Sequence, residues 1–246
     1  MTLKKKSPIM SDVNVYVYQA NNCPKLNKIY VKGHTQVLID YGVKMVTSRK
    51  PTWINHNKTH CIVAIDSDNE MVGGIRIQIA DWIKPLPMEV AISPLDEGIH
   101  DLVRKQKDIG VGELCGLWNS KKVAGKGLSY ALTRAAVAYV EELSFEILMG
   151  ICAEYSLGMF QSVGFEVDKS LGNNGEFPYP TEKYITQVVG ILNAKKLKSA
   201  SPEEKKLILE LRKNLDISRE EHGKSGSLKL KYNLKNECSD HILDII

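Results

Sequence analysis

The sequence predicts an α/β protein of the α+β type, in which helices cover both faces of a central sheet. Three consecutive features indicate this class. An apolar, strand-like run from Val111 to Trp118 leads into a glycine-containing turn, and the turn opens directly onto an amphipathic helix. A second, almost continuous apolar run from Phe145 to Cys152 is typical of a central strand that is covered on both faces.

The helix that follows the turn has one apolar side. Residues of this stripe recur at helical spacing: Leu128, Ala131, Leu132, Ala135, Ala136, Tyr139, Val140 and Leu143. A second, shorter helix is predicted from about Tyr155 to Val163, with Gly164 in the usual place for a helix stop. The predicted order is therefore strand, turn, helix, strand, helix and strand.

The N-terminal part of the chain predicts one strand, an ambiguous segment and a hairpin. Asn14 to Tyr18 is strand-like, whereas Lys25 to Tyr41 carries mixed helical signals that Gly33 interrupts. Two apolar runs, residues 61–65 and 71–77, flank the turn-forming residues Asp-Ser-Asp-Asn and predict a hairpin. The connection that follows, from Ala80 to Ile109, is long, and long connections in compact domains are usually functional or mobile.

The character of the chain changes after about Leu192. The segment Ser201-Pro-Glu-Glu is a capping box with proline at the first helical position, and it predicts a helix to about Asn214. Residues 227–235 alternate apolar and polar side chains, which predicts an edge strand with lysines on its outer face. This appendage completes the core, binds a partner or forms a homodimer. The expected division is a tail at 1–12, a domain at 13–192 and the appendage at 193–246.

Composition favours a soluble, cytoplasmic enzyme. The chain has 246 residues and a net charge of +4, too mild for a nucleic-acid-binding face to be expected. Since no segment approaches about 18 uninterrupted apolar residues, neither secretion nor a membrane span is expected. The five cysteines contain no CxxC pair, and their apolar surroundings indicate reduced thiols.

The turn between strand and helix has the features of a phosphate cradle. Gly125 and Gly127 permit tight backbone turns, and the free N–H groups of the first helical turn attract an anion. A Walker A loop needs a glycine where this chain has Ser120 and a serine or threonine where it has Gly127, so that motif is excluded. A Rossmann fingerprint needs a small residue where this chain has Tyr130, so that motif is excluded as well. An ordinary strand-to-helix turn remains the alternative.

These residues resemble the GNAT N-acetyltransferase superfamily. Its signature turn, (Gln/Arg)-x-x-Gly-x-(Gly/Ala) after the fourth strand, is matched here by Lys122, Gly125 and Gly127. Its later Leu-Tyr-x-x-x-Gly-Phe signature is similar to the segment at 159–165, where Phe160 replaces the tyrosine that protonates the leaving thiolate in many members. The resemblance covers about 180 residues, a normal size for one domain.

The resemblance implies a mixed sheet splayed at its fourth and fifth strands, with acetyl-CoA or another acyl-CoA as donor and no metal. A glycine within a strand often marks a bulge, and Gly116 would support the splay. The next amide, from Leu117, would polarise the thioester carbonyl. The pyrophosphate would bind at Lys122, Val123, Ala124, Gly125, Lys126, Gly127 and Leu128.

Glu113 is the candidate general base. It is the only charged residue in the strand-like run, and burial raises the proton affinity of a carboxylate toward neutrality. Counting along the strand places it on the same face as Leu117. The structural alternative is that Glu113 forms an ion pair with an arginine such as Arg76.

The acceptor is expected to be an amine of a small molecule or of a protein. Candidate residues on the acceptor side are Arg76, His100, Tyr155 and Tyr179. No residue is a clear general acid, and solvent can protonate the thiolate instead. Neither the acceptor nor the length of the acyl chain follows from the sequence.

A second resemblance, to acyl-homoserine-lactone and N-acyl amino acid synthases, supports an alternative function. These enzymes share the GNAT fold and take acyl chains from acyl carrier protein. The similarity lies at Gly74-Ile75-Arg76 and at Glu113-Leu114, whereas Cys115-Gly116 replaces the Ser/Thr-Arg pair that follows the glutamate in those enzymes. A third reading is a non-catalytic domain that only binds acyl-CoA.

Overall fold

The computed structural model describes residues 11–42, 51–235 and 242 of the chain. Within them, ten strands form one mixed sheet in the order β6-β8-β5-β4-β3-β2-β1-β10-β9, with β7 paired to β8. The strands are β1 (Ser11–Gln19), β2 (Thr59–Asp66), β3 (Met71–Ile79), β4 (Val111–Asn119), β5 (Ile147–Ala153), β6 (Glu166–Val167), β7 (Glu176–Pro178), β8 (Ile185–Ile191), β9 (Asp216–Gly223) and β10 (Gly226–Asn233).

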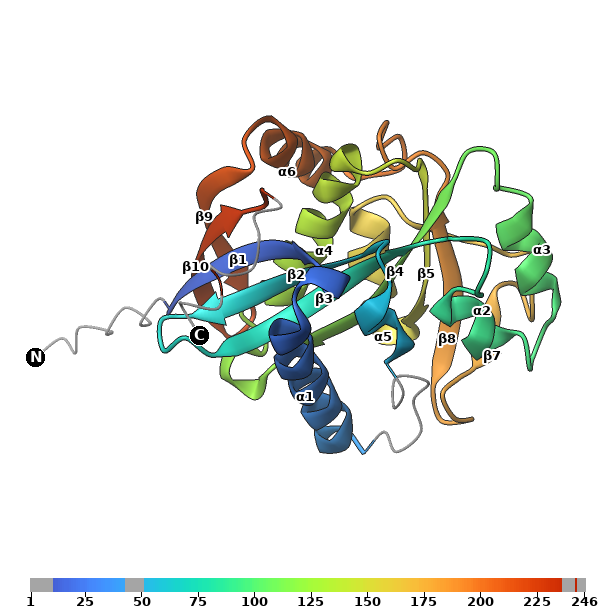
Figure 1. Ribbon diagram of the computed structural model, residues 1–246, viewed down its shortest axis with the longest axis horizontal. Coiled ribbons are helices and arrows are strands. Elements are labelled where there is room, and N and C mark those ends of the chain that lie inside the picture. Colours follow the sequence, from blue (N-terminus) through green and yellow to red (C-terminus); the bar gives the residue numbers. More distant parts are fainter. Residues whose placement is uncertain (1–10, 43–50, 236–241, 243–246) are drawn as a thin grey trace, which may run out of the picture.

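Helices cover both faces of this sheet, as predicted (Figure 1). The α-helices are α1 (Pro24–Asp40), α2 (Pro87–Ile92), α3 (Gly98–Arg104), α4 (Leu128–Tyr139), α5 (Glu154–Ser162) and α6 (Pro202–Lys213). Short 3-10 turns are η1 (Ala20–Asn22), η3 (Thr52–Asn55), η4 (Lys121–Val123) and η5 (Val140–Glu142). None of the helices in the described part of the chain is long and apolar enough to cross a membrane.

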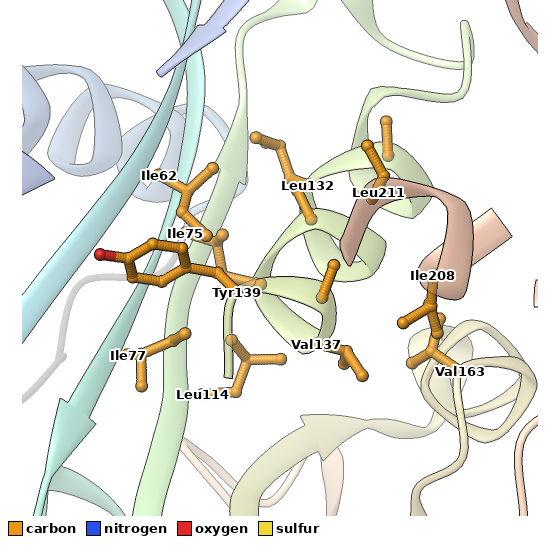
Figure 2. Packing of buried hydrophobic residues seen from close by; sticks show 14 of the residues in the cluster. Ile62, Ile75, Ile77, Leu114, Leu132, Val137, Tyr139, Val163, Ile208 and Leu211 are labelled. Atoms are coloured by element: carbon orange, nitrogen blue, oxygen red, sulfur yellow. The ribbon is translucent and has the colours of Figure 1, made fainter. Parts of the chain in front are cut away.

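The main core lies between the sheet and α4. Ile75, Ile77 and Leu114 of the sheet face this helix, and Leu132 lies on the helix side (Figure 2). On its far side α4 packs against α6, which contributes Ile208 to the same cluster. Helix α4 is therefore buried on two sides, and its apolar residues extend beyond a single stripe.

The opposite face of the sheet carries two smaller clusters. Helix α1 packs there against β2, β3 and the end of β4, and it is continuous through Gly33. The ring of Trp118 occupies the space that a side chain at 33 would need, so the glycine permits close packing and does not interrupt the helix. Helices α2 and α3, from the long connection, cover the other end with Met88, Ile92 and Val103.

Strands β4 and β5 separate partway along their length. They are parallel neighbours at three positions, ending at Glu113 opposite Met149. Beyond that point β4 bulges: β3 pairs Gly74 with Trp118 but Arg76 with Cys115, so β4 contains an extra residue. Gly116 lies in this bulge with φ at +63°, a backbone conformation that favours glycine. The predicted splay and the predicted bulge are both confirmed.

The C-terminal segment is part of the same sheet. Strand β10 lies between β1 and β9, so the edge strand is β9, and the prediction that residues 227–235 form an edge strand was wrong. The alternating apolar residues were read correctly as one buried face, since Leu228, Leu230 and Tyr232 are buried in the main core. Helix α6 begins as predicted, with the Ser201 hydroxyl accepting the Glu204 amide at 3.2 Å.

Candidate active site

Glu113 lies at the point where β4 and β5 separate. Its side chain is 1% exposed, and Oε2 accepts a hydrogen bond from the amide of Met88 at 2.9 Å. Met88 stands in the first turn of α2, directly after Pro87. The long connection therefore folds back to place a helix N-terminus against the carboxylate.

Burial raises the pKa of Glu113 to about 8. The amide of Met88 and the charge of Arg76 act in the opposite direction, whereas the nearby carboxylate of Glu89 raises this pKa further. A carboxyl group with a pKa near neutrality exchanges protons readily at physiological pH, which is the property required of a general base.

Glu113 and Leu117 lie on opposite faces of the sheet, so the expectation that they share a face was wrong. Leu117 packs against the core beneath α4, while Glu113 pairs across the strands with Gln78 on the face of α1 and α2. The extra residue at the Gly116 bulge inverts the alternation along β4. Leu117 follows the Gly116 bulge, in the part of β4 that no longer pairs with β5.

Arg76 shares a face with Glu113 but does not form an ion pair with it. Its guanidinium is buried against the ring of Trp53, with 4.8 Å between the guanidinium carbon and the ring centroid. No carboxylate oxygen of the described residues lies within 4.0 Å of its nitrogens, and its Nε and Nη1 have no hydrogen-bond partner there. The structural alternative for Glu113, an ion pair with Arg76, is not observed.

The glycine turn leads into α4 as the phosphate-cradle prediction requires. Gly125 and Gly127 have φ at +72° and +92°, and no side chain in the described part of the chain caps α4. The amides of Val123, Ala124 and Lys126 donate to carbonyls within the turn. The donors that remain for a ligand are therefore the amides of the two glycines and those of the first turn of α4, which begins at Leu128.

A pocket of about 580 Å³ opens at this helix N-terminus. The tip of the β9–β10 hairpin forms its other wall and touches the glycine turn directly. The amide of Ser225 donates to the Gly125 carbonyl at 2.9 Å, and a side chain at Gly223 would collide with the backbone of Gly125 and Gly127. The pocket is lined by Asn119, Gly125, Gly127, Leu128, Ser129, Tyr130, His222, Gly223 and Lys224.

Lys122 is engaged elsewhere. Its ammonium lies on the turn between β2 and β3, with Nζ at 2.5 Å from Asp66, 2.6 Å from Asp68 and 3.3 Å from Glu70. These carboxylates raise the pKa of Lys122 and compensate its charge. In this arrangement the lysine fastens the cradle to the β2–β3 hairpin.

The other candidates on the acceptor side are dispersed. His100 of α3 bonds through Nδ1 to Glu89 at 2.8 Å, in a second pocket of about 360 Å³. Tyr155 is 87% exposed at the start of α5, and Tyr179 packs against the cluster beneath α2 and α3. Phe160 is buried edge-to-face on Phe165, so no hydroxyl stands at the position of the tyrosine in the GNAT signature.

Two parts of the site were missed in the sequence. The hairpin tip, His222 to Lys224, lies about 95 residues after the glycine turn and follows a charged strand that carries no apolar periodicity. The amide of Met88 is a backbone group and leaves no signature, although Pro-Met after a loop is a recognisable helix start.

Comparisons with known proteins identify the fold. FeeM, an N-acyl amino acid synthase from uncultured soil microbes, matches with a TM-score of 0.61 at 11% identity, over 80% of this chain and 98% of FeeM. BjaI, a CoA-dependent acyl-homoserine lactone synthase solved with SAM and isopentyl-CoA, matches at 0.53 and 12% identity, over 95% and 98% of the two chains. An acyl-CoA N-acyltransferase from Pseudomonas aeruginosa matches at 0.50 and 13%, over 73% and 99%.

These neighbours are N-acyltransferases of the GNAT fold, and the chain has that fold. No protein-family model and no curated protein sequence matches the chain. Because sequence identity to the solved structures is low, the similarity establishes the fold alone.

Proposed function

We propose that this protein is an acyl-CoA-dependent N-acyltransferase whose general base is Glu113. The observation that carries the proposal is the position of this buried carboxyl at the point where β4 and β5 separate. The thioester of the donor lies in the splay, and the donor phosphates bind in the pocket at the N-terminus of α4. Acetyl-CoA is the first donor to test.

The reaction proceeds by direct transfer. The neutral amine attacks the thioester carbonyl carbon, a C–N bond forms and the C–S bond breaks. Glu113 accepts the amine proton directly or through one water, and solvent protonates the leaving thiolate because Phe160 offers no hydroxyl. The amide of Leu117, beside the Gly116 bulge, donates to the carbonyl oxygen as negative charge develops.

The experiment is a thiol-release assay with acyl-CoAs of increasing chain length and a library of amines. We expect turnover with acyl-CoA in the absence of any carrier protein. Glu113→Gln should lower turnover by about 10²–10⁴-fold while preserving donor binding in calorimetry. Donor binding without turnover of any amine would favour a domain that only binds acyl-CoA.

The second candidate is a synthase that takes longer acyl chains from acyl carrier protein. It is favoured by the match to FeeM, which spans nearly all of that synthase, and by the absence of a tyrosine at position 160. Turnover that appears only with acyl carrier protein or long acyl chains would select this candidate and contradict acetyl transfer.

A further inference from the structure

Gln78 of β3 lies directly opposite Glu113 of β4. The antiparallel register pairs these two residues, so their side chains share one face of the sheet, with Cβ atoms about 4.5–5.5 Å apart. Both side chains are buried, at 8% and 1% exposure. The neighbour of Glu113 on its other side, Met149 of β5, is apolar. Gln78 is therefore the polar one of the two cross-strand neighbours of Glu113.

The side-chain oxygen of Gln78 needs a hydrogen-bond donor. Oε1 is buried, and no donor group of the described residues lies within hydrogen-bond distance of it. Thr59, which pairs with Gln78 from β2, has its hydroxyl 3.4 Å from Nδ1 of His56 and is engaged there. Because a buried carbonyl oxygen without a donor is costly, we expect the donor from a neighbour that can carry a hydrogen in one of its protonation states.

Glu113 is a neighbour of this kind. An ionised carboxylate only accepts hydrogen bonds, whereas a protonated carboxyl has one O–H donor. Burial raises the pKa of Glu113 to about 8, so the protonated form predominates at neutral pH. Since Oε2 already accepts the amide of Met88, Oε1 is left to carry the proton. The donor of Glu113 and the unpaired acceptor of Gln78 thus lie on paired residues of the same buried face.

We infer that Gln78 is a positioning residue for Glu113 and binds this carboxyl in both of its protonation states. In the protonated state, the O–H of Glu113 donates to Oε1 of Gln78. When the carboxyl loses its proton to solvent, the amide of Gln78 turns about its last side-chain bond and donates from Nε2 to the carboxylate. Because each carboxylate oxygen has two lone pairs, one remains free for the proton of the amine. This last step rests on the proposed acyl transfer, whereas the pairing itself does not.

The test measures the pKa of Glu113 in the free protein by NMR titration of ¹³C-labelled glutamate carboxyl carbons, with Glu113→Gln to assign the signal. A hydrogen bond to a charged group contributes more than one between neutral groups, so Gln78→Met should raise this pKa by about one unit. The rise of kcat/KM with pH should move to higher pH by the same amount. The other groups that act on this carboxyl, Arg76, Cys115 and Glu89, are unchanged in the variant.

Gln187 of β8 is the matched control. It is similarly buried, at 7% exposure, and its Oε1 also has no partner among the described residues, but its amide nitrogen binds Glu176. Gln187→Met should therefore leave the titration of Glu113 unchanged. At pH 6, Gln78→Met should lower the melting temperature because the carboxyl O–H loses its acceptor, whereas removal of an oxygen that has no donor would raise it.

The inference is overturned if Gln78→Met leaves the pKa of Glu113 unchanged, or if Gln187→Met shifts it by a similar amount. Gln78→Asn repeats the test with a polar side chain that is one methylene shorter, and it should shift the pKa in the same direction as Gln78→Met. Absence of turnover with every amine would overturn the proposed function, and the titration would still decide whether Gln78 binds Glu113.

Discussion

The amide of Met88 donates a hydrogen bond to Oε2 of Glu113, across 25 residues of sequence, at 2.9 Å. Pro87 has no N–H, so Met88 supplies the first donor of α2. This donor favours the ionised carboxylate and acts against the burial that raises its pKa. The long connection before β4 thus lowers the pKa of Glu113 through the amide of Met88.

The pH dependence of turnover should report this carboxyl. If Glu113 acts as the base, kcat/KM should rise with pH and level off above about pH 8, because only the ionised form accepts a proton. This rise is the acidic limb of the pH–rate profile. Glu113→Gln should abolish the acidic limb as well as most of the activity. A Gln variant with turnover near that of the parent and an unchanged limb would show that Glu113 is structural.

The variant Glu89→Gln tests whether the acidic limb of the pH–rate profile follows the pKa of Glu113. The charge of Glu89 raises the pKa of Glu113, so its removal should move the limb to lower pH. The Gln side chain can still accept the Leu86 amide that Glu89 binds at 2.7 Å, which keeps the start of α2 in place. A limb that stays in place would argue against electrostatic coupling between the two carboxyls.

Stability should depend on pH through Glu113. Its pKa in the folded protein, about 8, exceeds that of the unfolded chain, 4.5, so folding takes up a proton between these values and stability declines as pH rises through this window. Glu113→Gln removes this decline because the amide resembles the protonated carboxyl. The variant should therefore gain in melting temperature relative to the parent from pH 5 to pH 8. An equal difference at both pH values would contradict the raised pKa.

The sequence patterns predicted where strands and a bulge form better than they predicted on which face of the sheet a side chain lies. Gly116 indicated a bulge because a glycine in a strand is a local signal, and the bulge is there. The relation of Glu113 to Leu117 was predicted wrongly because alternation along a strand fails at the extra residue. Strand β9 was not predicted, since its sequence, DISREEHG, has few apolar side chains and depends on pairing with β10.

Lys224 should contribute to donor binding where Lys122 does not. Lys224 lines the pocket at the N-terminus of α4, whereas Lys122 is compensated by carboxylates of the β2–β3 turn. Lys224→Glu should weaken CoA binding in calorimetry by about 5- to 10-fold, with a stronger effect at low salt. Lys229→Glu, on an exposed position of β10, is the matched control and should leave the affinity unchanged.

A pantetheine derivative without phosphates separates charge from shape. Its affinity should be equal for the parent and for Lys224→Glu, because the lysine acts on the phosphates. Equal CoA affinity for the parent and for Lys224→Glu would show that Lys224 does not interact with the donor phosphates and that the hairpin tip only lines the pocket. Gly127→Val is a less specific test of CoA binding than Lys224→Glu. A β-carbon at position 127 would lie 3.0 Å from the His222 carbonyl oxygen and would strain the hairpin as well as the glycine turn.

The network around Arg134 should be the main polar link between the C-terminal segment and α4. Its guanidinium joins Glu204 of α6 to Glu221 of β9, and all three side chains are largely buried. Arg134→Met would leave two buried carboxylates without their partner, so we expect a loss of about 3–5 kcal/mol in the free energy of unfolding.

The exposed pair of Arg104 and Asp101 on α3 is the control for Arg134. Both of these side chains are mostly in solvent, so Arg104→Met should change stability by less than about 0.5 kcal/mol. Because Arg134 binds Glu221 of β9, and the end of β9 leads into the hairpin tip that lines the donor pocket, Arg134→Met should also weaken CoA binding. Denaturant titration and calorimetry on the same samples measure both quantities. Unchanged CoA affinity in a clearly destabilised Arg134→Met protein would show that the donor pocket does not depend on the C-terminal hairpin.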